Sequence, residues 1–79
     1  MPEITSQVKT TFAEIMKISA DTVKLDVSLA DEYGLESVKA LKLISDIEVE
    51  YDIDIDEDEA RELRTLGDVI ALIESKLDS

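Results

Sequence analysis

The stretch Tyr33-Gly34-Leu35-Glu36-Ser37-Val38-Lys39-Ala40-Leu41 marks the point at which this chain passes from an irregular segment into an amphipathic helix. Gly34 is a turn residue, and from Ser37 onward apolar residues recur at helical spacing. The pattern predicts a helix from Ser37 to about Tyr51. At about 100° per residue its core face is a broad arc with Leu41 at the edge, formed by Ala40, Leu43, Ile44, Ile47 and Tyr51.

Ser37 is the best candidate for this chain's chemistry. The first residue of a helix lies beside unpaired backbone N–H groups, and a phosphate ester built on its oxygen would lie at the positive end of the helix dipole. Serine is also among the commonest helix N-caps, so a purely structural cap is the alternative interpretation.

Two valines of the same predicted helix, Val38 and Val49, fall outside its core face. Single exposed valines are normal on protein surfaces. The alternative is a docking surface, in which small apolar anchors lie inside a charged rim. The polar residues on the valines' face are Lys39, Lys42, Ser45, Asp46 and Glu50.

The remainder of the chain predicts three more helices. Apolar residues at helical spacing indicate a first helix over about 3–18. Residues 19–35 lose that period but keep apolar side chains, which indicates a long loop pinned to the core; loops of this length are often functional. Capping patterns at Asp56-Glu57-Asp58-Glu59 and Thr65-Leu66-Gly67-Asp68 predict a short third helix and a last helix that ends near Lys76.

Asp52-Ile53-Asp54-Ile55-Asp56 alternates like a strand, but it is too short and isolated to form a stable sheet. A connecting loop with two buried isoleucines explains it as well. The predicted fold is all-α: a small four-helix bundle with three longer helices, one short helix and a long first loop. No repeat or domain boundary is evident, so residues 1–79 are expected to form a single domain.

Composition narrows the function classes. The net charge of -12 would repel nucleic acid and anionic membranes, so basic protein surfaces are the expected partners. The absence of Cys and His removes thiol catalysis, imidazole bases and the usual zinc ligands. The N-terminus lacks the regions of a signal peptide and no apolar run approaches membrane-spanning length, so a cytoplasmic location is expected.

Metal binding and catalysis are the weaker interpretations. Asp52, Asp54 and Asp56 match the first, third and fifth positions of an EF-hand loop, but Glu57 replaces the required glycine and Leu63 the bidentate glutamate. No specific metal site is therefore expected. A hydrolase built on Ser37 would lack its histidine, so catalysis by this chain alone is not expected either.

The order of these features resembles the acyl carrier protein family, and the resemblance covers nearly the whole chain. It is carried by Gly-Leu-Glu-Ser-Val opening the second helix, the Ile-x-Ile loop, the short acidic helix and the Thr-capped last helix. The other matching positions are Tyr51, Ala60 and Thr65. In that family a serine at the position of Ser37 carries a phosphopantetheine arm, transferred from coenzyme A by a phosphopantetheinyl transferase.

The resemblance implies a monomeric carrier that is not an enzyme and holds acyl intermediates as thioesters for fatty-acid or polyketide-like biosynthesis. Its partners would be acyl-processing enzymes with basic docking surfaces. The expected contacts are Glu36, Val38, Asp46, Val49 and Glu50, with Lys39 and Lys42 as specificity elements.

Three departures from the family pattern limit what carries over. Glu36 replaces the usual aspartate, Lys39 and Lys42 replace an acidic start of helix two, and Asp56 replaces a common proline. The rival from another class is an acidic helical interaction module that never carries a prosthetic group, in which Ser37 is only a cap.

Overall fold

The computed structural model describes residues 3–78, apart from the side chains of Glu3 and Ser37. This part of the chain is helical and contains no strand. It therefore confirms the all-α bundle, with three long helices. The elements in order are α1 (Glu3–Met16), the 3-10 helix η1 (Ala20–Thr22), α2 (Leu29–Tyr33), α3 (Ser37–Tyr51), α4 (Glu57–Arg61) and α5 (Leu66–Leu77).

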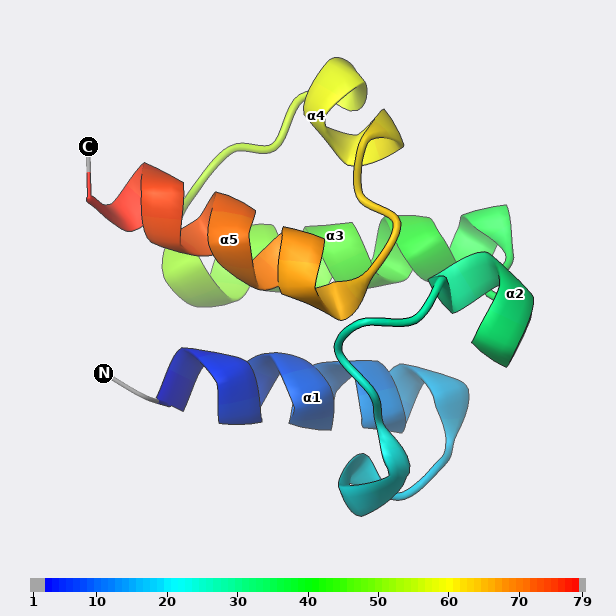
Figure 1. Cartoon of the computed structure of the whole chain (residues 1–79). Helices are drawn as coiled ribbons and strands as arrows, with labels where there is room; N and C mark the ends of the chain where they lie inside the picture. The colour runs from blue at the N-terminus through cyan, green and yellow to red at the C-terminus, as the bar shows by residue number, and fades with distance from the viewer. Residues whose placement is uncertain (1–2, 79) are drawn as a thin grey trace.

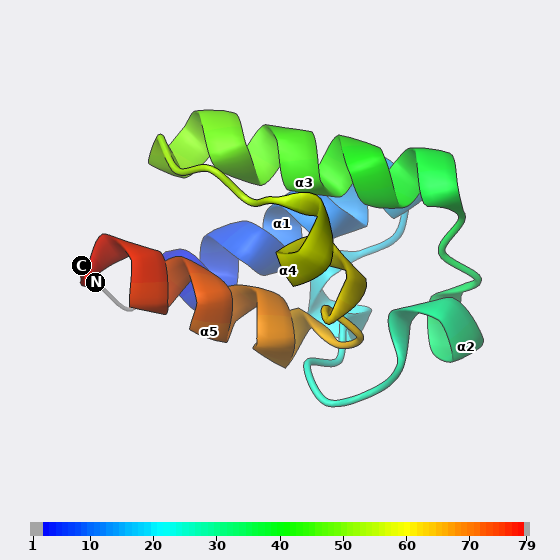
Figure 2. The same cartoon turned by 90° about the horizontal axis from the view of Figure 1, so that it is seen from above.

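The three long helices form the body of the molecule (Figure 1). α1 packs against both α3 and α5. The start of α1 and the end of α5 lie at one end of the bundle in both views, and α2 lies at the opposite end, where α3 begins (Figure 2). α4 lies beside α3 and α5 on the side away from α1.

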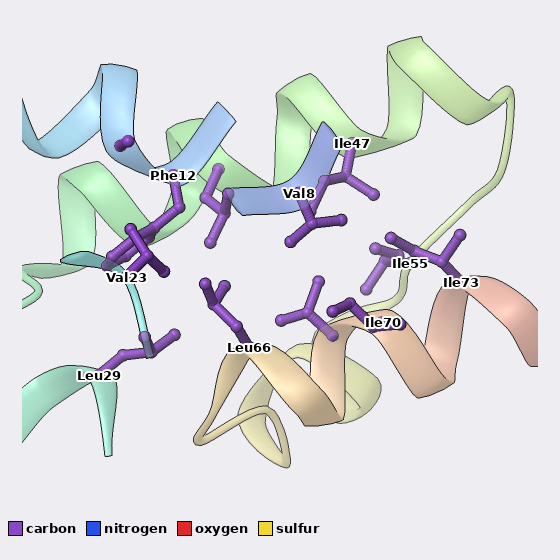
Figure 3. Close-up of a cluster of buried hydrophobic side chains, with 12 residues drawn as sticks. Val8, Phe12, Val23, Leu29, Ile47, Ile55, Leu66, Ile70 and Ile73 are labelled. Atoms are coloured by element: carbon purple, nitrogen blue, oxygen red, sulfur yellow. The ribbon is translucent and has the colours of Figure 1, made fainter. Parts of the chain in front are cut away.

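The core is built from aliphatic side chains around a single aromatic ring. Phe12 is fully buried and makes an edge-to-face contact with Tyr33, with ring centroids 5.1 Å apart. Buried side chains of α1, α3 and α5 converge on one interior, to which α2 adds Leu29 and the loops add Val23 and Ile55 (Figure 3). Ala13, which the apolar spacing did not mark, is also buried. The core residues of the three long helices are Val8, Phe12, Ala13, Leu43, Ile47, Leu66, Val69, Ile70 and Ile73.

The first helix ends two residues earlier than predicted. Lys17 adopts a left-handed backbone conformation with φ 59°, and the N–H of Ile18 donates to the carbonyl of Ala13 at 3.0 Å. This is the closing hydrogen bond of a Schellman motif. Ile18, which the periodicity assigned to the helix, therefore lies beyond it and is exposed.

The segment predicted as a long pinned loop contains two short helices, and the prediction of an irregular loop was wrong for those residues. Ser28 caps α2 by accepting the N–H of Asp31. The segment is attached to the start of α5 by two backbone hydrogen bonds, from the N–H of Leu29 to Arg64 O and from the N–H of Gly67 to Leu25 O. It is therefore pinned, as expected, but partly helical.

The second half of the chain follows the prediction closely. α3 has the predicted bounds, and Ile53 and Ile55 lie in a loop and not in a strand. The Ile55 N–H donates to the Glu48 carboxylate at 2.8 Å, which ties this loop to α3. Both predicted capping boxes are present, Asp56 with Glu59 on α4 and Thr65 with Asp68 on α5.

Candidate functional site

The start of α3 is the candidate site, and its N-cap residue is Glu36 and not Ser37. Ser37 is the first helical residue, and Glu36 occupies the N-cap position with extended φ and ψ. The interpretation of Ser37 as an ordinary cap is therefore wrong for this structure. The Glu36 side chain makes no capping hydrogen bond. The side chain of Ser37 itself lies outside the described part of the chain.

A glycine turn directs the chain into this site. Gly34 ends α2 in the left-handed conformation, with φ 61° and ψ 37°. Its N–H donates to Ala30 O at 3.0 Å, and the N–H of Leu35 donates to Leu29 O at 3.3 Å. Because an L-residue with a side chain rarely adopts this conformation, glycine is the residue suited to the turn. The turn leaves Leu35 half-buried, and α3 begins two residues later.

Tyr33 holds the segment before the turn in place. Its hydroxyl accepts the N–H of Lys24 at 2.9 Å and donates to the carbonyl of Thr22 at 3.3 Å. The ring packs on Phe12. The loop that precedes α2 and the helix α2 are therefore fixed to each other and to the core through one side chain.

The N-terminus of α3 differs from those of α2, α4 and α5. Each of these three helices has a side-chain cap and an acidic residue in its first turn. α3 has neither. Its first N–H groups thus have no side-chain acceptor from the N-cap residue, and the exposed N-cap carboxylate of Glu36 is the acidic group nearest this start, since the first turn contains none. The start of α3 therefore fits a phosphate ester better than the start of any of these other helices.

Three apolar side chains of α3 are exposed. Val38 is 76% exposed and Val49 is 81% exposed, so both lie outside the core as the helical pattern predicted. Leu41, which was expected at the edge of the core face, is 67% exposed and does not belong to the core. Val38 and Leu41 are three residues apart and are therefore neighbours on the helix surface, close to Ser37 in sequence.

The charged candidates on α3 are all at the surface, and only two of them are joined. Lys42 and Asp46 form an ion pair at 2.9 Å. Glu50 accepts a long hydrogen bond of 3.4 Å from the Thr11 hydroxyl. Lys39 is exposed and forms no ion pair with another described side chain. The structure thus places Glu36, Val38, Lys39, Lys42, Asp46, Val49 and Glu50 on or beside one helix, as the sequence required.

A small apolar cavity of about 40 Å³ lies between α3 and the shorter helices. Leu35 and Ala40, which flank Ser37 in sequence, belong to its wall. The remaining lining is entirely apolar and comes from α2, α3, the two loops flanking α4, α4 itself and α5: Leu29, Leu43, Ile44, Ile47, Ile55, Ala60, Leu63 and Val69. Sequence periodicity identified several of these as core residues but could not place a cavity among them.

Among the residues that the structure describes, two titratable groups have shifted pKa values, and both have structural roles. Hydrogen bonds from the backbone N–H groups of Arg64 and Thr65 hold the pKa of Asp68 below its usual value. Burial, with a smaller effect of the neighbouring Glu50 charge, raises the pKa of Tyr51. The Tyr51 hydroxyl therefore keeps its proton and donates it to Gln7 Oε1 at 2.6 Å, which joins the end of α3 to α1.

Within residues 3–78 there is no cluster of three or more His, Cys, Asp or Glu side chains arranged to hold a metal ion. None of the helices described has both the length and the apolar character that a membrane span requires.

The sequence of this chain matches a known family model and proteins of one family. Residues 6–73 match the family model of the phosphopantetheine attachment site. An acyl carrier protein of Exiguobacterium sibiricum is 32% identical over 75 residues, which cover 95% of each chain. That of Thermotoga maritima is 31% identical over 75 residues, covering 95% of this chain and 93% of the relative.

The fold agrees with that of a solved acyl carrier protein. The structure of the Enterococcus faecalis protein superposes with a TM-score of 0.81 over 95% of both chains, at 21% sequence identity. At this identity the likeness concerns the fold alone. Together with the sequence matches, which span nearly the full length, it identifies the chain as a member of the acyl carrier protein family, a phosphopantetheine-bearing carrier and not an enzyme.

Proposed function

We propose that Ser37 is the residue to which the phosphopantetheine is attached. The observation that carries this proposal is the start of α3: the serine opens the helix, and the N-cap Glu36 makes no side-chain hydrogen bond there. The first N–H groups of α3 receive no acceptor from the N-cap side chain, and they would stabilise a phosphate on the serine oxygen. The Ser37 hydroxyl oxygen would attack the pantetheine-side phosphorus of coenzyme A, losing its proton; the new phosphodiester bond forms as the pyrophosphate bond breaks, and adenosine 3′,5′-bisphosphate leaves.

The attached group supplies the thiol that this chain lacks, since the chain has no cysteine. The other residues near Ser37 either position the backbone or contact partner enzymes. Gly34 and Tyr33 fix the backbone that leads into the helix, and the exposed face of α3 offers Val38 and Val49 for contact with partner enzymes. Glu36, Asp46 and Glu50 add acidic contacts, and Lys39 and Lys42 adjust the choice of partner.

The proposed pathway is fatty-acid biosynthesis or a related, polyketide-like route, in which the carrier presents acyl thioesters to successive enzymes. The partners are a phosphopantetheinyl transferase and acyl-processing enzymes. The net charge of -12 favours basic surfaces on those enzymes. We propose that residues 1–79 act as one monomeric carrier domain in the cytoplasm.

The apolar cavity beside α3 supports an acyl cargo. Its lining contains no polar residue, and two of its residues flank Ser37 in sequence. A volume of about 40 Å³ is only a few times the roughly 10–15 Å³ that a cavity needs to hold one water. The cavity as it stands therefore accommodates only the beginning of an alkyl chain, and a longer chain requires the shorter helices to move outward.

The absence of cysteine permits a direct test of the proposed function. Incubation with coenzyme A and a phosphopantetheinyl transferase should raise the titratable thiol content from none to one per chain, and acylation should then remove that thiol. A chain that gains no thiol under conditions that load a known carrier would favour the rival interpretation, an acidic interaction module without a prosthetic group.

A further inference from the structure

The first half of α3 carries a charge opposite to that of the chain as a whole. The chain has 20 acidic and 8 basic residues, yet the first turn of α3 contains no carboxylate. Lys39 and Lys42 follow Ser37, whereas the acidic residues of this helix begin at Asp46 and include Glu50. α3 thus carries two lysines in its first half and carboxylates farther along, while the exposed N-cap residue Glu36 places one carboxylate immediately before Ser37.

These charges flank the exposed apolar side chains. At about 100° per residue, Val38 and Val49 project in nearly the same direction, and they are 76% and 81% exposed. Lys39 and Glu50 project within about 20° of each other, to one side of the valines, about 100° around the helix from Val38. We call this side of α3 the charged flank. Apolar anchors beside charged groups are the usual composition of a docking surface.

The two ends of the charged flank act separately. The ion pair of Lys42 with Asp46 neutralises its middle. Lys39 and Glu50 remain without an ion pair among the described side chains, and they are eleven residues apart. At about 1.5 Å per residue the separation along the helix is about 16 Å, roughly twice the Debye length at physiological ionic strength. A partner therefore meets Lys39, a cation within one turn of the N-cap residue Glu36, separately from Glu50 at the far end of the helix.

We propose that this surface docks in one orientation on a partner enzyme that places a carboxylate against Lys39 and a lysine or arginine about 16 Å away against Glu50. The inference rests on the proposed function of Ser37, because the partner must receive the arm at the Lys39 end. An enzyme that places a lysine or arginine against Lys39 is repelled at that position, while basic groups elsewhere on its surface still face the acidic residues of this chain. Repulsion of this kind determines which partners are rejected and how the accepted one is oriented.

The test uses one carrier-dependent acyltransferase in two forms. The first form has a uniformly basic docking surface, and in the second the basic residue nearest its arm channel is changed to glutamate. The parent carrier should show a kcat/KM about three- to tenfold higher with the second form, as expected for one or two exposed charge contacts. Lys39→Glu should reverse this preference, and 1 M salt should reduce both preferences.

Two further variants separate local charge from net charge. Lys39→Glu combined with Glu50→Lys leaves the net charge at -12 and should still reverse the preference at the arm channel. Lys9→Glu makes the same charge change on α1 and should keep the parent's preference. Equal preferences of the parent and Lys39→Glu, or a reversal by Lys9→Glu, would overturn the inference.

Thiol titration before each assay keeps the two proposals distinguishable. A parent carrier that does not load contradicts the role of Ser37, and this inference with it. A parent that loads normally, but shows no preference that depends on Lys39, overturns the inference alone.

Discussion

Replacing Gly34 by alanine should destabilise the fold through the backbone alone. Gly34 has φ 61°, and a Cβ built on it would meet no atom within 4 Å. The new methyl group therefore has no clash to relieve and no contact to gain. The cost is that of an L-residue in the left-handed region, about 1–2 kcal/mol. For a domain of this size, each kcal/mol corresponds to a fall in Tm of about 4–8 °C.

Chemical denaturation of the parent, Gly34→Ala and Gly34→Asn would measure this cost. Asparagine tolerates the left-handed region better than alanine does, so Gly34→Asn should lose clearly less free energy of unfolding than Gly34→Ala. The order parent, Asn, Ala is specific to a conformational cause. An alanine variant as stable as the parent, or an asparagine variant that is the less stable of the two, would refute the reasoning.

Three further predictions concern the surface. Val38→Ser and Val49→Ser should each change the free energy of unfolding by no more than about 0.5 kcal/mol while slowing acyl transfer by partner enzymes; a loss of several kcal/mol would place these valines in the core. Because the folded pKa of Asp68 is lowered, its stabilising effect is present above the unfolded pKa and is lost as pH falls through the folded one. Asp68→Asn should therefore flatten the pH dependence of unfolding below about pH 4, and an unchanged profile would contradict this. Ten acidic residues and one arginine lie between Asp46 and Glu62, so added salt or magnesium should raise Tm at neutral pH; a flat or falling Tm would show that repulsion there is unimportant.

The sequence predicted the second half of the fold well because its signals are local. The two capping boxes, at Asp56 and Thr65, are short-range patterns that need no tertiary information. The bounds of α3 followed from a long, regular apolar arc. The exposure of Val38 and Val49 followed from the same arc.

The errors arose where short or tertiary features decide. α2 has five residues, too few to show a helical period, although Ser28 and Gly34 marked its two ends. The early end of α1 depends on the left-handed backbone conformation of Lys17. Lysine has no preference for this conformation, so the sequence gives no signal for it. Leu41 was assigned to the edge of the core because a helical wheel does not show where the neighbouring helices stop.

The sequence predicted where the candidate site lies in the chain, but it did not predict how the surrounding residues are arranged in space. The sequence identified Ser37 as the start of a helix, but it did not reveal that Glu36 holds the cap position without a side-chain hydrogen bond. It also did not reveal the cavity, whose lining comes from segments far apart in the chain. Both features depend on how the segments pack, and a pattern within one segment cannot encode them.

Intact mass measured after incubation with coenzyme A and a phosphopantetheinyl transferase tests the central claim most directly. Ser37→Ala should stay helical, because Glu36 occupies the N-cap position and alanine is a strong helix former. Ser45→Ala, on the exposed part of the same helix, is the matched control. The parent and Ser45→Ala should each gain one phosphopantetheinyl group, and Ser37→Ala should gain none. A parent that gains no mass, or a Ser37→Ala variant that still gains it, would contradict the account.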